Sequence, residues 1–272
     1  MFKHFLTIFG LLATLNAGVG HLKPLPVSEV KPAAAQSANY LSRISKMGIS
    51  VNSNAPLSVT RKPTLKSIDH CASLIYKTLE NLPKNQVARL KNLTLSFDAN
   101  ARRGLGGGGT IILRCTNVSD QELIAVLVHE MGHILDTGVL QGSYLAGASE
   151  FKDGDSPIYN DDKSLEFYRI SFDNENNTLK NTKDTDFVSG YAKSNPFEDF
   201  AETYNYYILH GNEFRELLKT NEALTKKYNF LKQKIFNDQE FFNGDLNNIR
   251  NPKIRNYDTT ILAYEVHKFL MN

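Results

Sequence analysis

The sequence predicts an α+β fold, with a small mixed sheet, one long helix after it and a mainly helical C-terminal part. Three observations predict it. Residues 93–97 and 110–114 are short runs of β-branched and large apolar residues, typical of strands. Apolar residues recur at helical spacing from Leu123 to Leu135. Helical spacing also dominates the chain from about residue 197 onward.

Residues 1–20 have the pattern of a secretory signal peptide, with a basic start, an apolar run and small residues at its exit. The apolar run is short for a membrane span, and no long one follows, so we expect no membrane span in the mature form. An uncleaved anchor is the alternative. Four prolines among residues 21–60 predict a flexible arm or a pro-segment. The folded domain is then expected over residues 61–272.

Charge and cysteine content narrow the class of protein. The chain has 31 basic and 29 acidic residues and a formal net charge of +2, which does not indicate a nucleic-acid partner. Cys71 and Cys115 are the two cysteines. In a secreted or periplasmic protein they can pair, and closing a loop of about 45 residues would stabilise the fold by about 4 kcal/mol on the chain-entropy account. Two separate buried thiols are the alternative.

Three other segments have patterns that predict local structure. Residues 64–92 suggest one or two helices. The glycine run at 104–109 is either a flexible turn or a mobile rim beside an edge strand that pairs with substrate. Residues 141–190 form a long insertion, with short strands expected within 165–172.

The long helix carries His129-Glu130-Met131-Gly132-His133, a His-Glu-x-x-His motif. Two histidines four residues apart share a helix face and can bind one tetrahedral Zn²⁺. Glu130 can then act as the general base toward water at the metal. Ser119 opens a capping box, and Gly138 is the candidate stop. An ordinary core helix with two histidines is the alternative.

Catalytic zinc takes a third protein ligand, and a second helix offers two acids for it. Asn195 and Pro196 can begin this helix. Glu198 and Glu202 then share one face, so one can bind the metal while the other holds a ligand histidine in its tautomer. A solvated acidic first turn is the alternative. Asp136 either orients a ligand histidine or lies at a helix end.

These residues resemble the gluzincin clan of zinc metallopeptidases, in particular the catalytic domain of anthrax toxin lethal factor and small uncharacterised bacterial relatives. The likeness covers roughly residues 90–215. It implies a zincin-like metalloprotease domain, with the helix that bears the His-Glu-x-x-His motif at its active site. The residues that carry it are His129, Glu130, His133, Tyr191, Asn195, Glu198, Phe200, Ala201 and Glu202.

The resemblance implies a role for each residue of the site. His129, His133 and Glu198 are the implied zinc ligands and Glu130 the base. Tyr191, seven residues before Glu198, is the implied oxyanion donor. Glu202 is implied to support the ligands, and Glu202 as the metal ligand is the competing assignment.

The motif and the resemblance predict a secreted zinc-dependent endopeptidase that acts on a peptide or protein substrate. The alternative is a secreted binding or toxin-like interaction protein that keeps the zinc fold without useful catalysis.

Overall fold

The computed structural model describes residues 33–54, 65–250 and 257–271. Within these ranges it has an α+β architecture, with one small mixed sheet, two short hairpins and many helices, as the sequence predicts. No helix in these ranges is long and apolar enough to cross a membrane. The expected signal peptide at residues 1–20 lies outside the described residues.

The main sheet has the strand order β1-β2-β4-β3. β1 pairs parallel with β2, β2 pairs parallel with β4, and β4 pairs antiparallel with β3. On β2 and β4 the alternate residues face the core, so that four apolar side chains are fully buried. β3, the glycine-rich strand, is an edge. The strands are β1 (Ser50–Asn54), β2 (Asn92–Ser96), β3 (Gly104–Gly107) and β4 (Thr110–Arg114).

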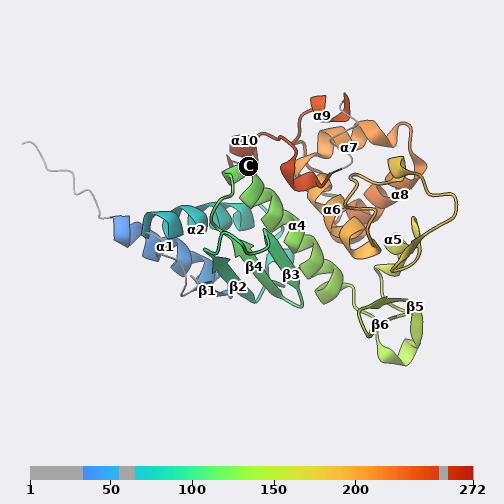
Figure 1. Cartoon of the computed structure of the whole chain (residues 1–272), viewed down its shortest axis with the longest axis horizontal. Coiled ribbons are helices and arrows are strands. Elements are labelled where there is room, and N and C mark those ends of the chain that lie inside the picture. The colour runs from blue at the N-terminus through green and yellow to red at the C-terminus, as the bar shows by residue number, and fades with distance from the viewer. Residues whose placement is uncertain (1–32, 55–64, 251–256, 272) are drawn as a thin grey trace, which may run out of the picture. The chain divides into compact units, whose positions relative to one another are not determined.

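Four helices lie within the described residues of the range 33–139, the part of the chain that also holds this sheet. Figure 1 labels three of them, α1, α2 and α4. They are α1 (Ala33–Lys46), α2 (Leu65–Glu80), α3 (Lys84–Val87) and α4 (Asp120–Val139). α1 packs on α2, α2 packs on α4, and α4 runs against β3 and β4. The expected helices at 64–92 are therefore confirmed, and the edge strand lies directly beside the helix that bears the two histidines.

The expectation of a flexible arm at residues 21–60 is wrong for residues 33–54. This segment forms α1 and β1, and β1 pairs with β2 along its whole length. Ile44 and Ile49 are almost completely buried, and removing such side chains from water stabilises the fold. The prolines on which the expectation was based lie at positions 24, 26, 32 and 56, outside the described part of the segment.

A disulfide between Cys71 and Cys115 joins α2 to the residue after β4, with the two Cα atoms 5.9 Å apart. It ties a helix of the core to the strand that neighbours β3. The crosslink therefore braces the same side of the sheet on which α4 lies.

The segment between α4 and the next long helix forms two hairpins and short helical turns. The strand prediction at 165–172 is wrong for residues 165–168, which form one helical turn in which Leu165, Phe167 and Tyr168 are all buried. The elements are η1 (Tyr144–Ala146), β5 (Ala148–Asp153), β6 (Ser156–Tyr159), α5 (Leu165–Tyr168), β7 (Phe172–Asn174), β8 (Asn177–Thr178) and η2 (Asp184–Asp186).

The C-terminal part is mainly helical, as predicted. Its centre is α6, which packs on α4 and is covered by α5, α7 and α8. A fully buried ion pair between Lys227 and Asp199 (2.6 Å) joins α8 to α6. The elements are α6 (Pro196–Leu209), α7 (Gly211–Leu218), α8 (Glu222–Phe230), η3 (Leu231–Ile235), α9 (Asn247–Arg250), η5 (Thr259–Ile261) and α10 (Val266–Met271).

Candidate metal centre

α4 begins and ends close to the predicted positions. The Ser119 hydroxyl accepts from the backbone N–H of Glu122, which caps the helix. The helix continues through Gly138 and ends one residue later at Val139. His129 and His133 are one turn apart, with ring centroids 5.0 Å from each other. Both imidazoles therefore face the same space.

Gly132 lets α4 and α6 approach closely. A Cβ built on Gly132 would lie 2.8 Å from the Cα of Ala201 and 3.3 Å from its Cβ. Any larger residue would push the two helices apart. The glycine within the motif therefore brings α6 close enough for its acids to reach the histidines.

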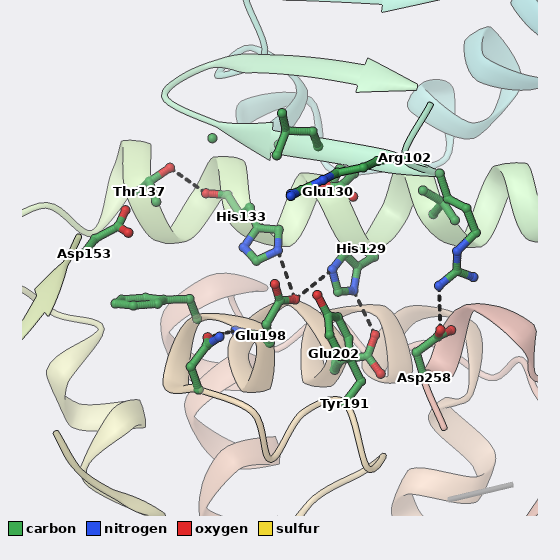
Figure 2. A pocket seen from close by; sticks show the side chains of 18 of the residues that line it. Arg102, His129, Glu130, His133, Thr137, Asp153, Tyr191, Glu198, Glu202 and Asp258 are labelled. Atoms are coloured by element: carbon green, nitrogen blue, oxygen red, sulfur yellow. Dashed lines mark hydrogen bonds and ion pairs between the residues drawn. The ribbon is translucent and has the colours of Figure 1, made fainter. Parts of the chain in front are cut away.

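α6 begins as the sequence predicts. The Asn195 side chain accepts from the backbone N–H of Glu198 at 2.9 Å, and Pro196 is the first helical residue. Glu198 and Glu202 lie four residues apart on one face of this helix, and both point toward α4 (Figure 2).

Glu198 approaches both imidazoles with the same oxygen. Its Oε2 lies 3.2 Å from Nε2 of His129 and 3.4 Å from Nε2 of His133. Ligands at about 2.0–2.2 Å from a tetrahedral zinc ion lie roughly 3.3–3.6 Å from one another. The same Oε2 is buried without a partner in hydrogen-bond geometry, which is unusual for a carboxylate oxygen. The donor set and its spacing fit a shared metal ion.

Glu202 lies on the other side of His129. Its Oε1 is 2.8 Å from Nδ1 of His129, while its Oε2 accepts from the Ser189 hydroxyl (2.5 Å) and from the backbone N–H of Thr259 (2.7 Å). A carboxylate on Nδ1 holds the proton there and leaves Nε2 to face the metal. This geometry separates the two acids, with Glu198 on the Nε2 side and Glu202 on the Nδ1 side.

The acids and the imidazoles of the site shift one another's pKa toward the charged forms. Burial lowers the pKa of His129, but the carboxylates of Glu198 and Glu202 outweigh it and raise the pKa to about 10. Burial raises the pKa of Glu198, but the two imidazoles outweigh it and hold the pKa below its usual range. The carboxylates thus favour positive charge on His129, and binding of a metal ion here would release protons.

Glu130 lies against the edge strand. A Cβ on Gly104 would lie 2.2 Å from Oε1 of Glu130, and a Cβ on Gly106 would lie 2.8 Å from Oε2. Burial raises the pKa of Glu130, and the two histidines and the Gly106 backbone partly offset the rise. The glycines of β3 therefore make room for this carboxylate, so the strand is part of the site and the simple flexible-turn interpretation of the run is wrong for residues 104–107.

A second set of three groups could also hold a metal. Ligand atoms of His129, Glu130 and His133 all lie within 4.8 Å of one another. Glu130, however, is packed against the backbone of β3, whereas Glu198 places one unpartnered oxygen between both Nε2 atoms. We therefore favour Glu198 over Glu130 as the third ligand.

Tyr191 lies at the edge of the site. Its ring stacks beside His129 with centroids 6.2 Å apart, and 44% of the residue is exposed. Burial raises the pKa of Tyr191, and the charge of Glu198 with its hydrogen bond adds to the rise. The phenol therefore stays protonated and can donate into the cleft.

Asp136 does not reach the histidines through any hydrogen bond found in the described residues. It is almost fully buried and accepts from the Tyr168 hydroxyl at 2.7 Å. Burial raises the pKa of Asp136 to about 7. The described contacts therefore give no support to the expectation that Asp136 orients a ligand histidine; Asp136 lies in the last turn of α4, the alternative, and joins this helix to α5 through Tyr168.

A cleft of about 1040 Å³ is lined by the residues of the site other than Asp136, namely His129, Glu130, His133, Tyr191, Glu198 and Glu202. Its walls come from β3, α4, the β5–β6 hairpin, the turn before α6 and the segment at 258–260. The volume is large enough for several residues of an extended peptide. Thr259 and Arg103 belong to no sequence motif, and the fold alone brings them to the site; Ser189 lies two residues before Tyr191, but its type gives no sign of its contact with Glu202.

Together the fold and the site define an α+β protein with a candidate metal centre between two helices and an edge strand. The family described as anthrax toxin lethal factor, N- and C-terminal domain, matches residues 76–234, more than half of the chain. The chain belongs to this family. No curated protein matches the chain, and neither does any solved structure.

Proposed function

We propose that this protein is a zinc-dependent endopeptidase of the gluzincin type with a zincin-like fold. One observation carries the proposal: a carboxylate oxygen on one helix lies 3.2 and 3.4 Å from the Nε2 atoms of two histidines on another helix, close to the spacing between ligands of one tetrahedral ion. Membership of the lethal factor family, whose name refers to a toxin, supports the same conclusion.

His129, His133 and Glu198 would hold the zinc, and this leaves a fourth position open. When bound, zinc supplies Lewis-acid chemistry and lowers the pKa of a water molecule to about 7. Glu202 would keep His129 in the tautomer with the proton on Nδ1. The chain's own residues would carry out the proton transfers.

Glu130 is the proposed general base. Its buried carboxylate faces the cleft between β3 and the histidines. It would take a proton from the attacking water and pass it to the amine that leaves. Because burial raises its pKa above that of a solvated glutamate, the carboxylate binds this proton more readily on its way to the leaving group.

Tyr191 is the proposed oxyanion donor. It extends into the cleft next to His129 and keeps its proton because its pKa is raised. One such donor typically contributes about 3–4 kcal/mol to the transition state. β3 is the last strand of its sheet, so its outer edge offers an extended substrate a strand to pair with, which would orient the peptide bond.

We further propose a secreted or periplasmic location. The pattern of residues 1–20 and the Cys71–Cys115 disulfide support it, because disulfides persist in oxidising compartments. The proposed folded domain begins at α1 (Ala33–Lys46) rather than at residue 61, and its partner is a peptide or protein substrate.

Gly104→Ala should lower kcat by about 10²-fold while zinc is retained, because the new Cβ would displace the Glu130 carboxylate and a misplacement of about 1 Å can cost this much. Gly138→Ala is the matched control, since a Cβ there meets nothing within 4 Å. Peptide hydrolysis and zinc content of both variants check this. Wild-type turnover in Gly104→Ala would contradict the placement of Glu130.

The function itself is tested with a random peptide library. We expect the purified protein to carry one zinc per chain and to cleave the library, as read by mass spectrometry. A chelator should stop cleavage and added zinc should restore it. A protein that holds zinc but cleaves nothing would instead support the alternative, a binding or toxin-like interaction protein.

A further inference from the structure

Four residues near the C-terminus, Tyr257–Thr260, lie against the metal centre although they follow Glu202 by more than fifty positions. We call them the C-terminal strap. The family match ends at residue 234, so the strap lies outside it. Thr259 and Thr260 are almost fully buried, and Asp258 is only 7% exposed. Three of the four strap residues are therefore packed into the fold.

The first contact of the strap is with Glu202. The backbone N–H of Thr259 donates to Glu202 Oε2 at 2.7 Å, and both residues are fully buried. A buried carboxylate needs donors to remain stable away from water. Its other donors are Ser189, on the same oxygen, and the Nδ1 side of His129 on Oε1. The strap thus fixes the acid that orients a ligand histidine.

The second contact is with the turn that carries Tyr191. The carbonyl oxygen of Tyr257 accepts from the backbone N–H of Gly190 at 3.0 Å and from that of Tyr191 at 3.5 Å. The Ser189 hydroxyl, which donates to Glu202, also accepts from the N–H of Ala192 at 3.0 Å. The Tyr191 turn and Glu202 are therefore held by one connected network.

The third contact reaches the edge strand. Arg103, the residue just before β3, donates to the Asp258 carboxylate at 2.6 Å and to the Thr260 hydroxyl at 2.9 Å. The Nη1 that donates to Thr260 also donates to Glu122 Oε1 on α4, at 3.3 Å. Figure 2 shows Asp258 on the same side of the site as Glu202. The strap thus links β3, the Tyr191 turn and Glu202.

We propose that the C-terminal strap positions the metal centre, by holding Glu202 against His129 and the Tyr191 turn beside it. The inference rests on the proposed function, since it concerns the same zinc site. Thr259 and Ser189 are positioning residues: they touch neither metal nor substrate and act through Glu202. Zinc affinity and the rate of the chemical step therefore depend on the strap, although it is distant from the other site residues in sequence.

The backbone donor can be removed alone. Thr259→Pro deletes the N–H and puts a ring carbon against Glu202 Oε2. Proline is tolerated at the first residue of a helical turn, and Asp258 before it already has φ −88° and ψ 159°, which a residue before proline prefers. Thr259→Ala is the matched control, because it keeps the N–H and removes a buried hydroxyl without a hydrogen-bond partner.

We expect Thr259→Pro to weaken zinc binding by about 10–100-fold, the range seen when partners of metal ligands are lost. Thr259→Ala should stay close to wild type. The probe is Zn²⁺ in competition with a chromophoric chelator, and circular dichroism verifies that each variant is folded. On the peptide library the proline variant should lose kcat at saturating zinc with KM unchanged, a split that general loosening of the fold would not produce.

A second variant covers the case in which Thr259→Pro does not fold. Asp258→Asn keeps the shape and the acceptor for the Thr260 N–H (3.0 Å) but loses the charge opposite Arg103. It should weaken zinc binding by about threefold, which is the effect expected from the loss of a partly exposed ion pair. If the wild type binds zinc and the folded variants bind it equally tightly, the strap proposal is overturned and the zinc site stands. A wild type that binds no zinc overturns both.

Discussion

Glu198→Ala is expected to lose zinc, whereas Glu202→Ala is expected to keep it with reduced affinity. Zinc bound by four protein ligands contributes about 10–16 kcal/mol, so one ligand carries roughly 3–4 kcal/mol, or about 10²–10³-fold in affinity. Of the two ring nitrogens of His129, Glu202 contacts only Nδ1, at 2.8 Å. Removing a partner of this kind costs about 10–100-fold.

The two variants make a matched pair, because both remove a glutamate from the same face of α6 and differ in which ring nitrogen they leave exposed. Zinc per chain after dialysis, measured by atomic emission, separates them. Equal zinc retention would show that Glu198 is no ligand. Greater loss in Glu202→Ala would assign the ligand to Glu202, the alternative that the sequence left open.

Glu130→Gln is expected to bind zinc as the wild type does and to hydrolyse peptides about 10²–10⁴-fold more slowly. The amide has nearly the size of the carboxylate, so it still fits beside Gly104 and Gly106, but it cannot accept the proton of the attacking water. Steady-state rates on library-derived peptides, at saturating zinc, measure the effect.

A glutamate elsewhere provides the control for the loss of one charge. Glu166→Gln alters a side chain that is 62% exposed on α5 and should leave both readouts unchanged. If Glu130→Gln lost zinc together with activity, Glu130 would be a ligand, as in the alternative group of His129, Glu130 and His133. Full activity would remove Glu130 from the mechanism.

The sequence predicted those parts of the site whose geometry is local. Helix periodicity and capping residues locate α4 and α6, and the spacing of four places each pair of side chains on one face. The sequence could not assign Glu198 and Glu202 to different ring nitrogens of His129. That division depends on how closely the helices cross, which Gly132 and Ala201 determine in three dimensions.

Long-range contacts account for the errors. β1 has mostly exposed, polar residues and no strand pattern, and it exists because β2 offers it a parallel partner. The glycine run was ambiguous because its role depends on Glu130, which follows it by more than twenty residues. Asp136 looked suited to hold a histidine, but Tyr168 from the insertion takes its carboxylate.

The C-terminal strap could not have been found from residue types alone. Its link to Glu202 is a backbone N–H, which every residue except proline has. Only the folded position of Thr259 distinguishes it from its neighbours. Sequence patterns thus identify side chains with distinctive chemistry, and the structure identifies the backbone groups that hold them.

The central claim is that His129, His133 and Glu198 bind a single zinc ion. A crystal structure of the zinc-loaded protein, with anomalous data collected at the zinc edge, tests it most directly. We predict one strong peak at about 2.0–2.2 Å from Nε2 of both histidines and from a carboxylate oxygen of Glu198. A peak bound by another set of residues, or a Glu198 carboxylate turned away from the metal, would contradict the claim.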